Sequence, residues 1–204
     1  MPRFLLGLAL IAMLAVQVVS VPALAAIVSI DEAKSEMSIG NAGAPVTIIE
    51  YSSLGCPNCA NFHKNTLPQI KKNYIDTGKV RLVYRDFPLG TAALAASMIA
   101  RCAGPKKYFG FVEILFRAQA QWSRSKDPMQ ALSKIARFGG LSDDDVQACL
   151  KRQTLLEHIS KGALVGQEKH KVDSTPFFII GDATVSGAQP FDAFKKVLDK
   201  ALSK

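Results

Sequence analysis

The chain of 204 residues is long enough for one domain with a sizeable hydrophobic core, and 49% of its residues are hydrophobic. Its formal net charge is +8, but the lysines and arginines are spread along the sequence and form no dense basic block. This distribution is typical of a solvated basic surface, so we expect no nucleic-acid partner.

The N-terminus has the three-part pattern of a secretory signal peptide. A short start with one basic residue, Arg3, precedes an apolar run over 4–21, and Ala23-Leu24-Ala25 supplies a small-x-small cleavage site. We therefore predict a signal peptide over 1–25, a mature domain over 26–204 and a periplasmic location. The alternative is an uncleaved membrane anchor, because the apolar run has about the length of a short spanning helix.

The first half of the mature sequence predicts a strand, a helix and a second strand. After a lead-in over 27–44, the run Pro45–Tyr51 is β-branched and apolar enough for a buried central strand. A helix is expected over 59–74, with a kink at Pro68. Val80–Tyr84 then predicts the second strand.

The second half predicts a block of helices, two strands and a closing helix. Apolar residues recur at helical spacing over 91–171, and Ser142 begins a capping-box pattern within this block. The buried-strand pattern returns at Pro176–Ile180, with Ala183–Ser186 as its hairpin partner. Phe191–Leu202 predicts an amphipathic closing helix.

The segment Cys56-Pro57-Asn58-Cys59 lies between the first strand and the helix that follows it. Two thiols at this spacing can close a small disulfide ring, and the first faces the partial positive charge of the helix N-terminus, which favours thiolate. Cys56 is therefore the expected exposed nucleophile and Cys59 the buried resolving thiol. A zinc site made from all four cysteines is the alternative. Cys102 and Cys149 form no second C-x-x-C, and Pro57 and Thr175-Pro176 have no role in such a site, so we expect no metal. Exchange between thiols and disulfides also needs no organic cofactor.

Glu50 and the pair Thr175-Pro176 are the next candidates. Glu50 is a carboxyl on an otherwise apolar strand; facing inward it could exchange protons with Cys59, and facing outward it would be an ordinary strand residue. Pro176 opens the later strand, where its missing N–H costs no ladder bond. In a cis bond it could hold a free backbone edge beside Cys56 for an extended substrate segment, whereas a trans bond would make it an ordinary strand start.

Three histidines and two further cysteines complete the list of reactive side chains. His63 lies one turn past the second thiol of the C-x-x-C, and we expect it to face solvent rather than bind a metal. His158 and His170 have no partner set in the sequence. Cys102 and Cys149 are either two free buried cysteines or a structural disulfide, and an oxidising compartment favours the disulfide.

Three motifs together resemble the DsbA-like thiol:disulfide oxidoreductases of the thioredoxin superfamily. They are IEYSSLGCPNC over 49–59, RDFPL over 85–89 and STPFFIIG over 174–181. The resemblance covers nearly all of the mature chain. It implies an α/β thioredoxin fold with a helical insertion, about 91–171, between the two halves of the fold.

The same resemblance implies roles for individual residues and partners. It implies that Pro176 is cis, that Thr175 contacts the substrate backbone beside Pro57 and Asn58, and that Glu50 is a buried proton-relay acid. Reduced or misoxidised exported proteins would be the substrates, and a DsbB-like membrane protein would reoxidise the chain. A monomer is expected. Some family members also have a disulfide within the helical insertion.

Asn58 departs from the pattern of the best-known strong oxidants of the family, which carry histidine at this position. That histidine helps to stabilise the thiolate, so we predict a less oxidising potential for this chain. A disulfide isomerase or reductase is the alternative function, because Thr175 before the proline also occurs in the isomerase branch. Isomerases of this superfamily usually carry an N-terminal dimerisation domain, and the roughly 20 residues between the predicted cleavage site and the first strand leave no room for it. A non-catalytic chaperone module using the same groove is a further alternative.

Overall fold

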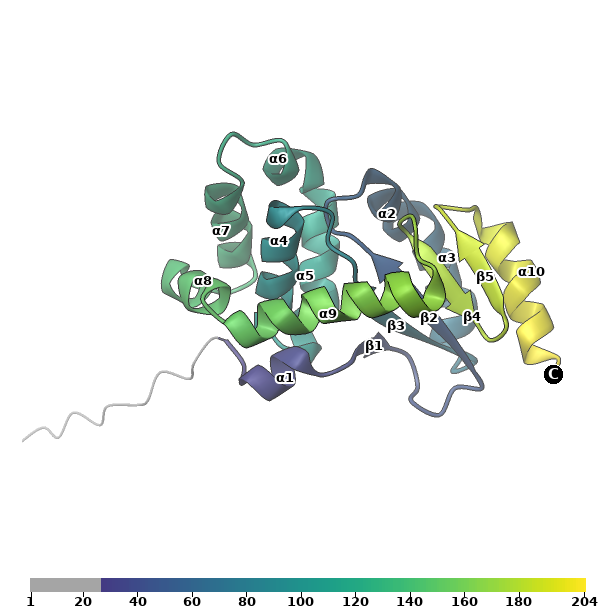
Figure 1. Ribbon diagram of the computed structural model, residues 1–204. Coiled ribbons are helices and arrows are strands. Elements are labelled where there is room, and N and C mark those ends of the chain that lie inside the picture. The colour runs from purple at the N-terminus through teal and green to yellow at the C-terminus, as the bar shows by residue number, and fades with distance from the viewer. Residues whose placement is uncertain (1–26) are drawn as a thin grey trace, which may run out of the picture.

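The computed structural model describes residues 27–204, in which a mixed sheet has helices on both faces and a block of helices beside it (Figure 1). The predicted signal peptide over 1–25 lies outside the described residues. Within the described part of the chain, no helix is both long and apolar enough to cross a lipid bilayer.

Five strands of the described residues form the sheet in the spatial order β1-β3-β2-β4-β5. β2 and β3 are parallel, while the other neighbouring pairs are antiparallel. The bounds are β1 Met37–Ile39, β2 Val46–Ser52, β3 Val80–Asp86, β4 Phe177–Ile180 and β5 Ala183–Ser186. The four predicted strands are confirmed to within two residues. The sequence pattern does not predict β1, because a three-residue strand carries too little alternation to be recognised.

Six helices, α4 to α9, lie between β3 and β4, and α10 follows the last strand. The bounds are α1 Ile30–Lys34, α2 Pro57–Asn61, η1 Phe62–Thr66, α3 Leu67–Ile70, η2 Lys71–Ile75, α4 Thr91–Cys102, α5 Pro105–Arg117, α6 Gln119–Ser123, α7 Pro128–Phe138, α8 Asp143–Leu150, α9 Gln153–His170 and α10 Phe191–Leu202. The capping box is confirmed at the start of α8. The Ser142 hydroxyl accepts a hydrogen bond from the Asp145 N–H at 3.1 Å, and the Asp145 carboxylate accepts one from the Ser142 N–H at 2.8 Å.

A continuous helix follows the C-x-x-C segment and consists of α2, η1, α3 and η2. Its η segments are π-helical; the Leu67 N–H donates to the carbonyl of Phe62, five residues earlier. Pro68 has no N–H, and its ring would crowd the carbonyl of the preceding turn of an α-helix. The widened turn immediately before Pro68 is how this helix accommodates the proline and continues beyond it.

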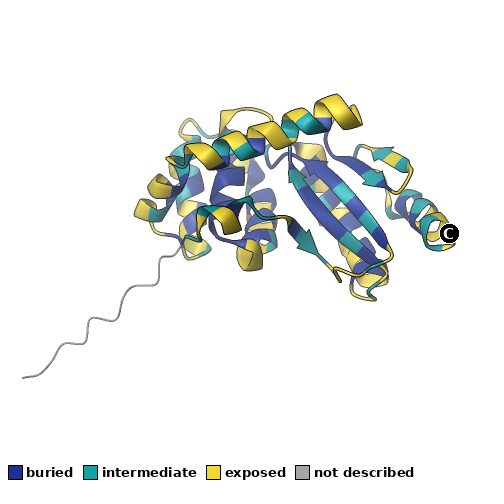
Figure 2. Cartoon of the chain, turned by 60° about the horizontal axis from the view of Figure 1, so that its bottom comes forward, coloured by how far each residue is buried: buried dark blue, intermediate teal, exposed yellow. Residues whose placement is uncertain are grey.

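Strand β2 presents alternate side chains to two different layers of the fold. Ile48 packs in a core shared with the α2–η2 helix and with Phe194 of α10. Tyr51 lies on the opposite face beneath α9, where a Cβ atom at Gly166 would stand 2.5 Å from its ring. Figure 2 shows the central strands as a largely buried layer. Because side chains alternate along a strand, Glu50 shares the face of Ile48 and points toward the α2–η2 helix.

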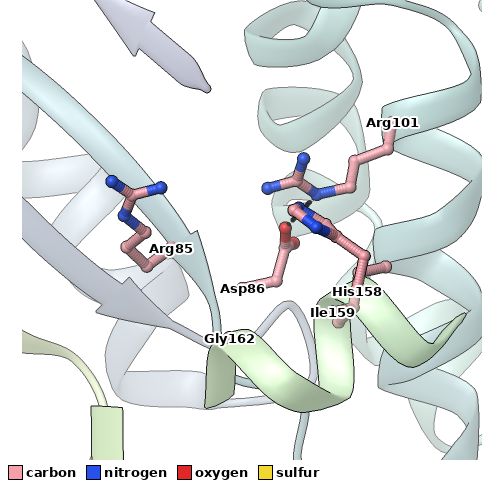
Figure 3. Close-up of a pocket in the computed structure, with 6 residues that line it drawn as sticks. All are labelled: Arg85, Asp86, Arg101, His158, Ile159 and Gly162. Atoms are coloured by element: carbon pink, nitrogen blue, oxygen red, sulfur yellow. Dashed lines mark hydrogen bonds and ion pairs between the residues drawn. The ribbon is translucent and has the colours of Figure 1, made fainter. Parts of the chain in front are cut away.

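A buried ion pair joins the sheet to the helical block. The Arg101 Nε atom on α4 donates to the Asp86 carboxylate at the end of β3, and Tyr108 of α5 donates its hydroxyl to the same carboxylate at 3.0 Å. The guanidinium also donates to the carbonyls of Ala33 and Ser35, at 3.0 and 3.1 Å. Figure 3 shows the two charged groups facing each other. They line a cavity of about 70 Å³. The Arg101–Asp86 pair therefore joins α4, β3, α5 and the end of α1.

A disulfide bond joins Cys102, the last residue of α4, to Cys149 of α8, with the Cα atoms 6.1 Å apart. Replacing both residues by alanine is expected to lower the free energy of unfolding by about 2–4 kcal/mol, because the bond constrains a long loop in the unfolded chain. Urea unfolding of the variant and the wild type, with Cys56 and Cys59 in the same redox state, measures the difference. Coinciding unfolding curves would show that the bond has no stabilising role.

Candidate active site

Cys56 and Cys59 lie at the junction of β2 and the helix that follows it. Cys56 occupies the N-cap position, and Pro57 the first helical position, where the missing N–H is not needed. Both cysteines are thiols in the structure. Cys59 is fully buried, as predicted, but Cys56 is only 8% exposed, so the prediction of an openly exposed nucleophile is wrong. The loop that precedes β4 is packed against its sulfur.

The pKa of the Cys56 thiol is lowered to about 5. The main cause is the hydrogen bond from the Cys59 side chain, which stabilises the Cys56 thiolate. The Thr175 side chain and the backbone N–H groups of Cys59 and Asn58 contribute in the same direction, while burial opposes them. The Asn58 side chain itself is exposed, so this residue acts through its backbone.

The pKa of the Cys59 thiol is strongly raised. Burial is the main cause, and the neighbouring Cys56 sulfur adds to it. The Ser53 N–H donates to the Cys59 sulfur at 3.4 Å, which acts weakly in the opposite direction. At neutral pH the reduced pair therefore carries one negative charge on Cys56 and one proton on Cys59.

Thr175 and Pro176 form the wall that faces Cys56. The peptide bond between them is cis, as the family resemblance implies. The Cys56 sulfur lies 3.3 Å from the Thr175 carbonyl oxygen, to which the protonated thiol donates a hydrogen bond, although the two residues are 119 positions apart. Both wall residues are buried, whereas Pro57 and Asn58 are exposed beside the thiol. The structure thus brings all four predicted substrate-binding residues to one place around the sulfur.

Glu50 and His63 form a buried pair beneath the thiols. Glu50 is 0% exposed, so it faces inward, and its Oε1 atom lies 2.9 Å from the Nε2 atom of His63. The His63 side chain is only 8% exposed, and the prediction of a solvent-facing histidine is therefore wrong. The physical reason is helix geometry: His63 follows Cys59 by four residues and lies on the same side of the helix, which packs on the sheet.

Gln119 is a site residue that the sequence does not reveal. From α6 its buried amide donates to the carbonyls of Leu54 and Cys56, at 2.7 and 3.0 Å, and so fixes the loop that carries the thiol. On the other side of the loop, the Ser53 hydroxyl accepts the Leu89 N–H at 3.1 Å. No local pattern marks a glutamine 63 residues away from the cysteine whose backbone it binds.

The remaining histidines and cysteines lie apart from this site. His158 lines the small cavity beside the buried ion pair, and the ring of His170 stands 5.9 Å from that of Tyr51. No group of three or more His, Cys, Asp or Glu side chains in residues 27–204 is arranged to hold a metal ion. The four-cysteine zinc alternative is contradicted, because Cys102 and Cys149 are bonded to each other.

The pKa of Cys56 predicts how the reduction potential of the pair should change with pH. Above about pH 5 the reduced form holds one proton, on Cys59, so two electrons are taken up with one proton. Below about pH 5 Cys56 is protonated as well, and two protons are taken up. The potential should fall by about 30 mV per pH unit on the neutral side and by about 59 mV per unit on the acid side.

Ultraviolet absorbance of the thiolate, followed during acid titration, locates the same transition. The pKa of Cys56 in the folded protein lies below that of a free thiol. The Cys56 thiolate therefore stabilises the folded reduced protein, and this contribution is fully present above the pKa of a free thiol. It is lost as the pH falls through about 5. A single slope of about 59 mV per unit throughout the neutral range would contradict a thiolate on Cys56.

Comparisons with known proteins agree with this architecture. A sequence model described as "Thioredoxin" matches residues 32–200. The crystal structure of alpha-DsbA1 from Wolbachia pipientis superposes with a TM-score of 0.78 and 28% sequence identity, covering 83% of this chain and 92% of that one. The predicted α/β thioredoxin fold with an inserted helical block is confirmed.

Curated relatives carry names of the same chemistry. A Rickettsia felis protein, provisionally named a protein-disulfide oxidoreductase, is 30% identical over 171 residues, which are 83% of this chain and 61% of that protein. Disulfide bond formation protein D of Bacillus subtilis is 25% identical over 175 residues, which are 83% of this chain and 78% of that protein. This chain spans about three fifths of the length of the Rickettsia relatives. The chain belongs to the thioredoxin family and is a DsbA-like member of that superfamily.

Proposed function

We propose that this chain is an exported thiol:disulfide oxidoreductase that introduces disulfide bonds into other proteins. The observation that carries the proposal is the placement of the two thiols: Cys56 stands at the helix N-cap against the Thr175 carbonyl, and Cys59 is fully buried one turn further on. This placement lowers the pKa of Cys56 and raises that of Cys59. A stabilised Cys56 thiolate favours the reduced form, which makes the corresponding disulfide a stronger oxidant. The names of the relatives support the same class of reaction.

In the proposed reaction a substrate thiolate attacks the Cys56 sulfur of the Cys56–Cys59 disulfide. The bond between the two cysteines breaks, its electron pair passes to Cys59, and Cys59 takes up a proton. A second substrate thiolate then attacks the substrate sulfur of the mixed disulfide, and Cys56 leaves as a thiolate. The substrate loses two electrons and gains a disulfide, while the chain is left reduced. The low pKa of Cys56 makes it a good leaving group in the second step.

The surroundings of the Cys56 sulfur fit an extended substrate segment. The backbone of Thr175 lies against the sulfur, and Pro176 begins the approach to β4 without an N–H of its own. A substrate strand lying here would pair with main-chain atoms regardless of its side chains, as in other modes of strand addition. Pro57 and Asn58, exposed beside the thiol, would contact the substrate from the other side.

The proposed partners follow from this chemistry. Reduced or misoxidised exported proteins are the substrates, and a DsbB-like membrane protein is the proposed electron acceptor for the reduced chain. Exchange between thiols and disulfides requires no metal and no organic cofactor. The proposed location is the periplasm, reached through the predicted signal peptide over 1–25, and the proposed state is a monomer.

Oxidation of an unfolded reduced protein tests the proposal. The fully oxidised chain is mixed with a reduced substrate that contains paired cysteines, and blocked thiols are counted by mass after rapid acid quenching. We expect the substrate to gain disulfides in proportion to the oxidised chain supplied. A disulfide isomerase, the second candidate suggested by Thr175 before the proline, would instead reshuffle a scrambled substrate with little net oxidation. A chaperone module would do neither.

A further inference from the structure

The buried pair of Glu50 and His63 lies where the helix that carries Cys59 packs on β2. The two side chains come from different elements, β2 and the helix after it, and meet at 2.9 Å. The His63 ring is held between aromatic neighbours, with the Phe116 centroid at 4.5 Å and the Tyr84 centroid at 5.9 Å. Such packing fixes the imidazole in one orientation toward the carboxyl.

Glu50 is placed on the side of the sheet that faces Cys59. It shares this face with Ser52, two residues along β2, whose hydroxyl faces the Cys59 sulfur. The Oε2 atom of Glu50 is buried and makes no hydrogen bond within the described residues, while Oε1 is bound to His63. One carboxyl oxygen is thus engaged by the imidazole and the other is free for a proton.

Exposure increases in one direction along this series. Cys59 and Glu50 are both fully buried, and the His63 side chain is 8% exposed. Cys59 must gain a proton when it is reduced and lose one when it attacks, because its raised pKa keeps it a thiol at neutral pH. His63 is therefore the one member of the series through which a proton can reach water.

No other charged side chain within residues 27–204 is paired with Glu50. From β3 the facing titratable group is Tyr84, whose pKa is raised well above its ordinary value by burial and then by the nearby Tyr108, so it keeps its proton. From α5 the neighbour of His63 is the aromatic ring of Phe116. Within residues 27–204, His63 is the hydrogen-bond partner of Glu50, and no lysine or arginine pairs with that carboxyl.

We propose that His63 is the proton port of the resolving cysteine, acting through Glu50. The inference rests on the proposed function and adds a relay residue to it. When Cys59 attacks a mixed disulfide on Cys56, its proton passes to the Glu50 carboxylate, and the partner thiol leaves Cys56 as a thiolate. The proton then moves from Glu50 to His63 and on to water. When a substrate thiolate opens the disulfide, the same proton travels inward to Cys59.

Removal of the imidazole should disable this route. In a His63→Gln variant, the buried Glu50 carboxyl has no neighbouring group that can both accept and release a proton. A proton passed from Cys59 to Glu50 then has no side chain through which it can reach water. Hydroxide must take that proton instead, so the Cys59 step should become slow and should rise steeply with pH.

Rapid mixing of the reduced chain with oxidised glutathione separates the two steps. Acid quenching and mass measurement give the rate of mixed-disulfide formation on Cys56 and the rate of its release by Cys59. We expect His63→Gln to leave the first rate unchanged and to slow the second by at least about tenfold near neutral pH. Release should then rise almost tenfold per pH unit, whereas the wild type should change much less. The control His158→Gln, which alters a histidine of α9, should match the wild type.

A double-variant comparison shows whether His63 acts through Glu50. Glu50→Gln with His63→Gln should release glutathione no more slowly than Glu50→Gln alone, because both changes interrupt one route. If His63→Gln does not fold, His63→Asn is measured in its place, with the far-ultraviolet spectrum as the check. The proposal would be overturned if His63→Gln had the release rate and pH profile of the wild type. It would also be overturned if the double variant released glutathione more slowly than Glu50→Gln by the same factor that His63→Gln alone loses. Because glutathione is the partner, this result does not depend on whether the chain oxidises proteins.

Discussion

Replacing Cys56 with serine is expected to abolish the oxidation of dithiol substrates, a loss of at least about a thousandfold in rate. A serine hydroxyl cannot form a sulfur–sulfur bond with Cys59, so no disulfide is available for a substrate to attack. The Cys56 sulfur is also the one that contacts the Thr175 carbonyl at 3.3 Å, and it alone has any exposure to a partner. Counting of blocked thiols in the substrate measures the loss.

Cys59→Ser is the matched variant, since it removes the other thiol of the pair. It should still attack a disulfide through Cys56 but should hold the partner as a stable mixed disulfide, because no resolving thiol is present. A trapped mixed disulfide on Cys59→Ser, and none on Cys56→Ser, would identify Cys56 as the nucleophile and Cys59 as the resolving thiol. If Cys56→Ser oxidised dithiol substrates as fast as the wild type, Cys56 would not be the attacked sulfur and the redox mechanism would be wrong.

Arg101→Met is expected to lower the free energy of unfolding by about 3–5 kcal/mol. The substitution preserves much of the side-chain volume but leaves Asp86 as a buried carboxylate without its cation (Figure 3). Tyr108 continues to donate one hydrogen bond to that carboxylate, which offsets only part of the loss. The carbonyls of Ala33 and Ser35 also lose their donor. Urea unfolding followed by circular dichroism measures the change.

Arg117→Ala is the surface control for this prediction. Arg117 pairs with Glu113 one turn earlier on α5, and both side chains are more than 60% exposed. Exposed pairs of this kind contribute about 0.2–1 kcal/mol at most, so the variant should unfold close to the wild type. Equal losses for Arg101→Met and Arg117→Ala would show that burial gives the Asp86 pair no special role in stability.

The sequence is sufficient to predict the parts of the site that are close together along the chain. Cys56 and Cys59 share one helical turn with Pro57, and Glu50 stands on the strand that leads into that turn, so local patterns define their places. Apolar runs with β-branched residues also identify the two central strands. Pro176 could be placed at a strand start because its missing N–H is tolerated there.

The parts that sequence reasoning missed depend on contacts between distant segments. Gln119 binds the backbone beside Cys56 from a helix more than 60 residues away, and its surroundings carry no distinguishing pattern. No sequence pattern indicates that Arg101 and Asp86 are buried and paired, because the burial of charges is decided by how α4 meets the sheet. His63 could have been predicted as buried, because its spacing of four residues from Cys59 places it on the same side of the helix. The expectation of a solvent-facing side chain rested only on the usual exposure of polar residues on helices.

The equilibrium reduction potential of the Cys56–Cys59 pair against glutathione tests the central claim most directly. The lowered pKa of Cys56 predicts an oxidising pair, and the absence of a histidine at Asn58 predicts one weaker than the strongest oxidants of the family. The expected value at neutral pH is therefore below about −120 mV and above about −200 mV. A value near −270 mV, where thioredoxin lies, would contradict the account and identify the pair as a reductant.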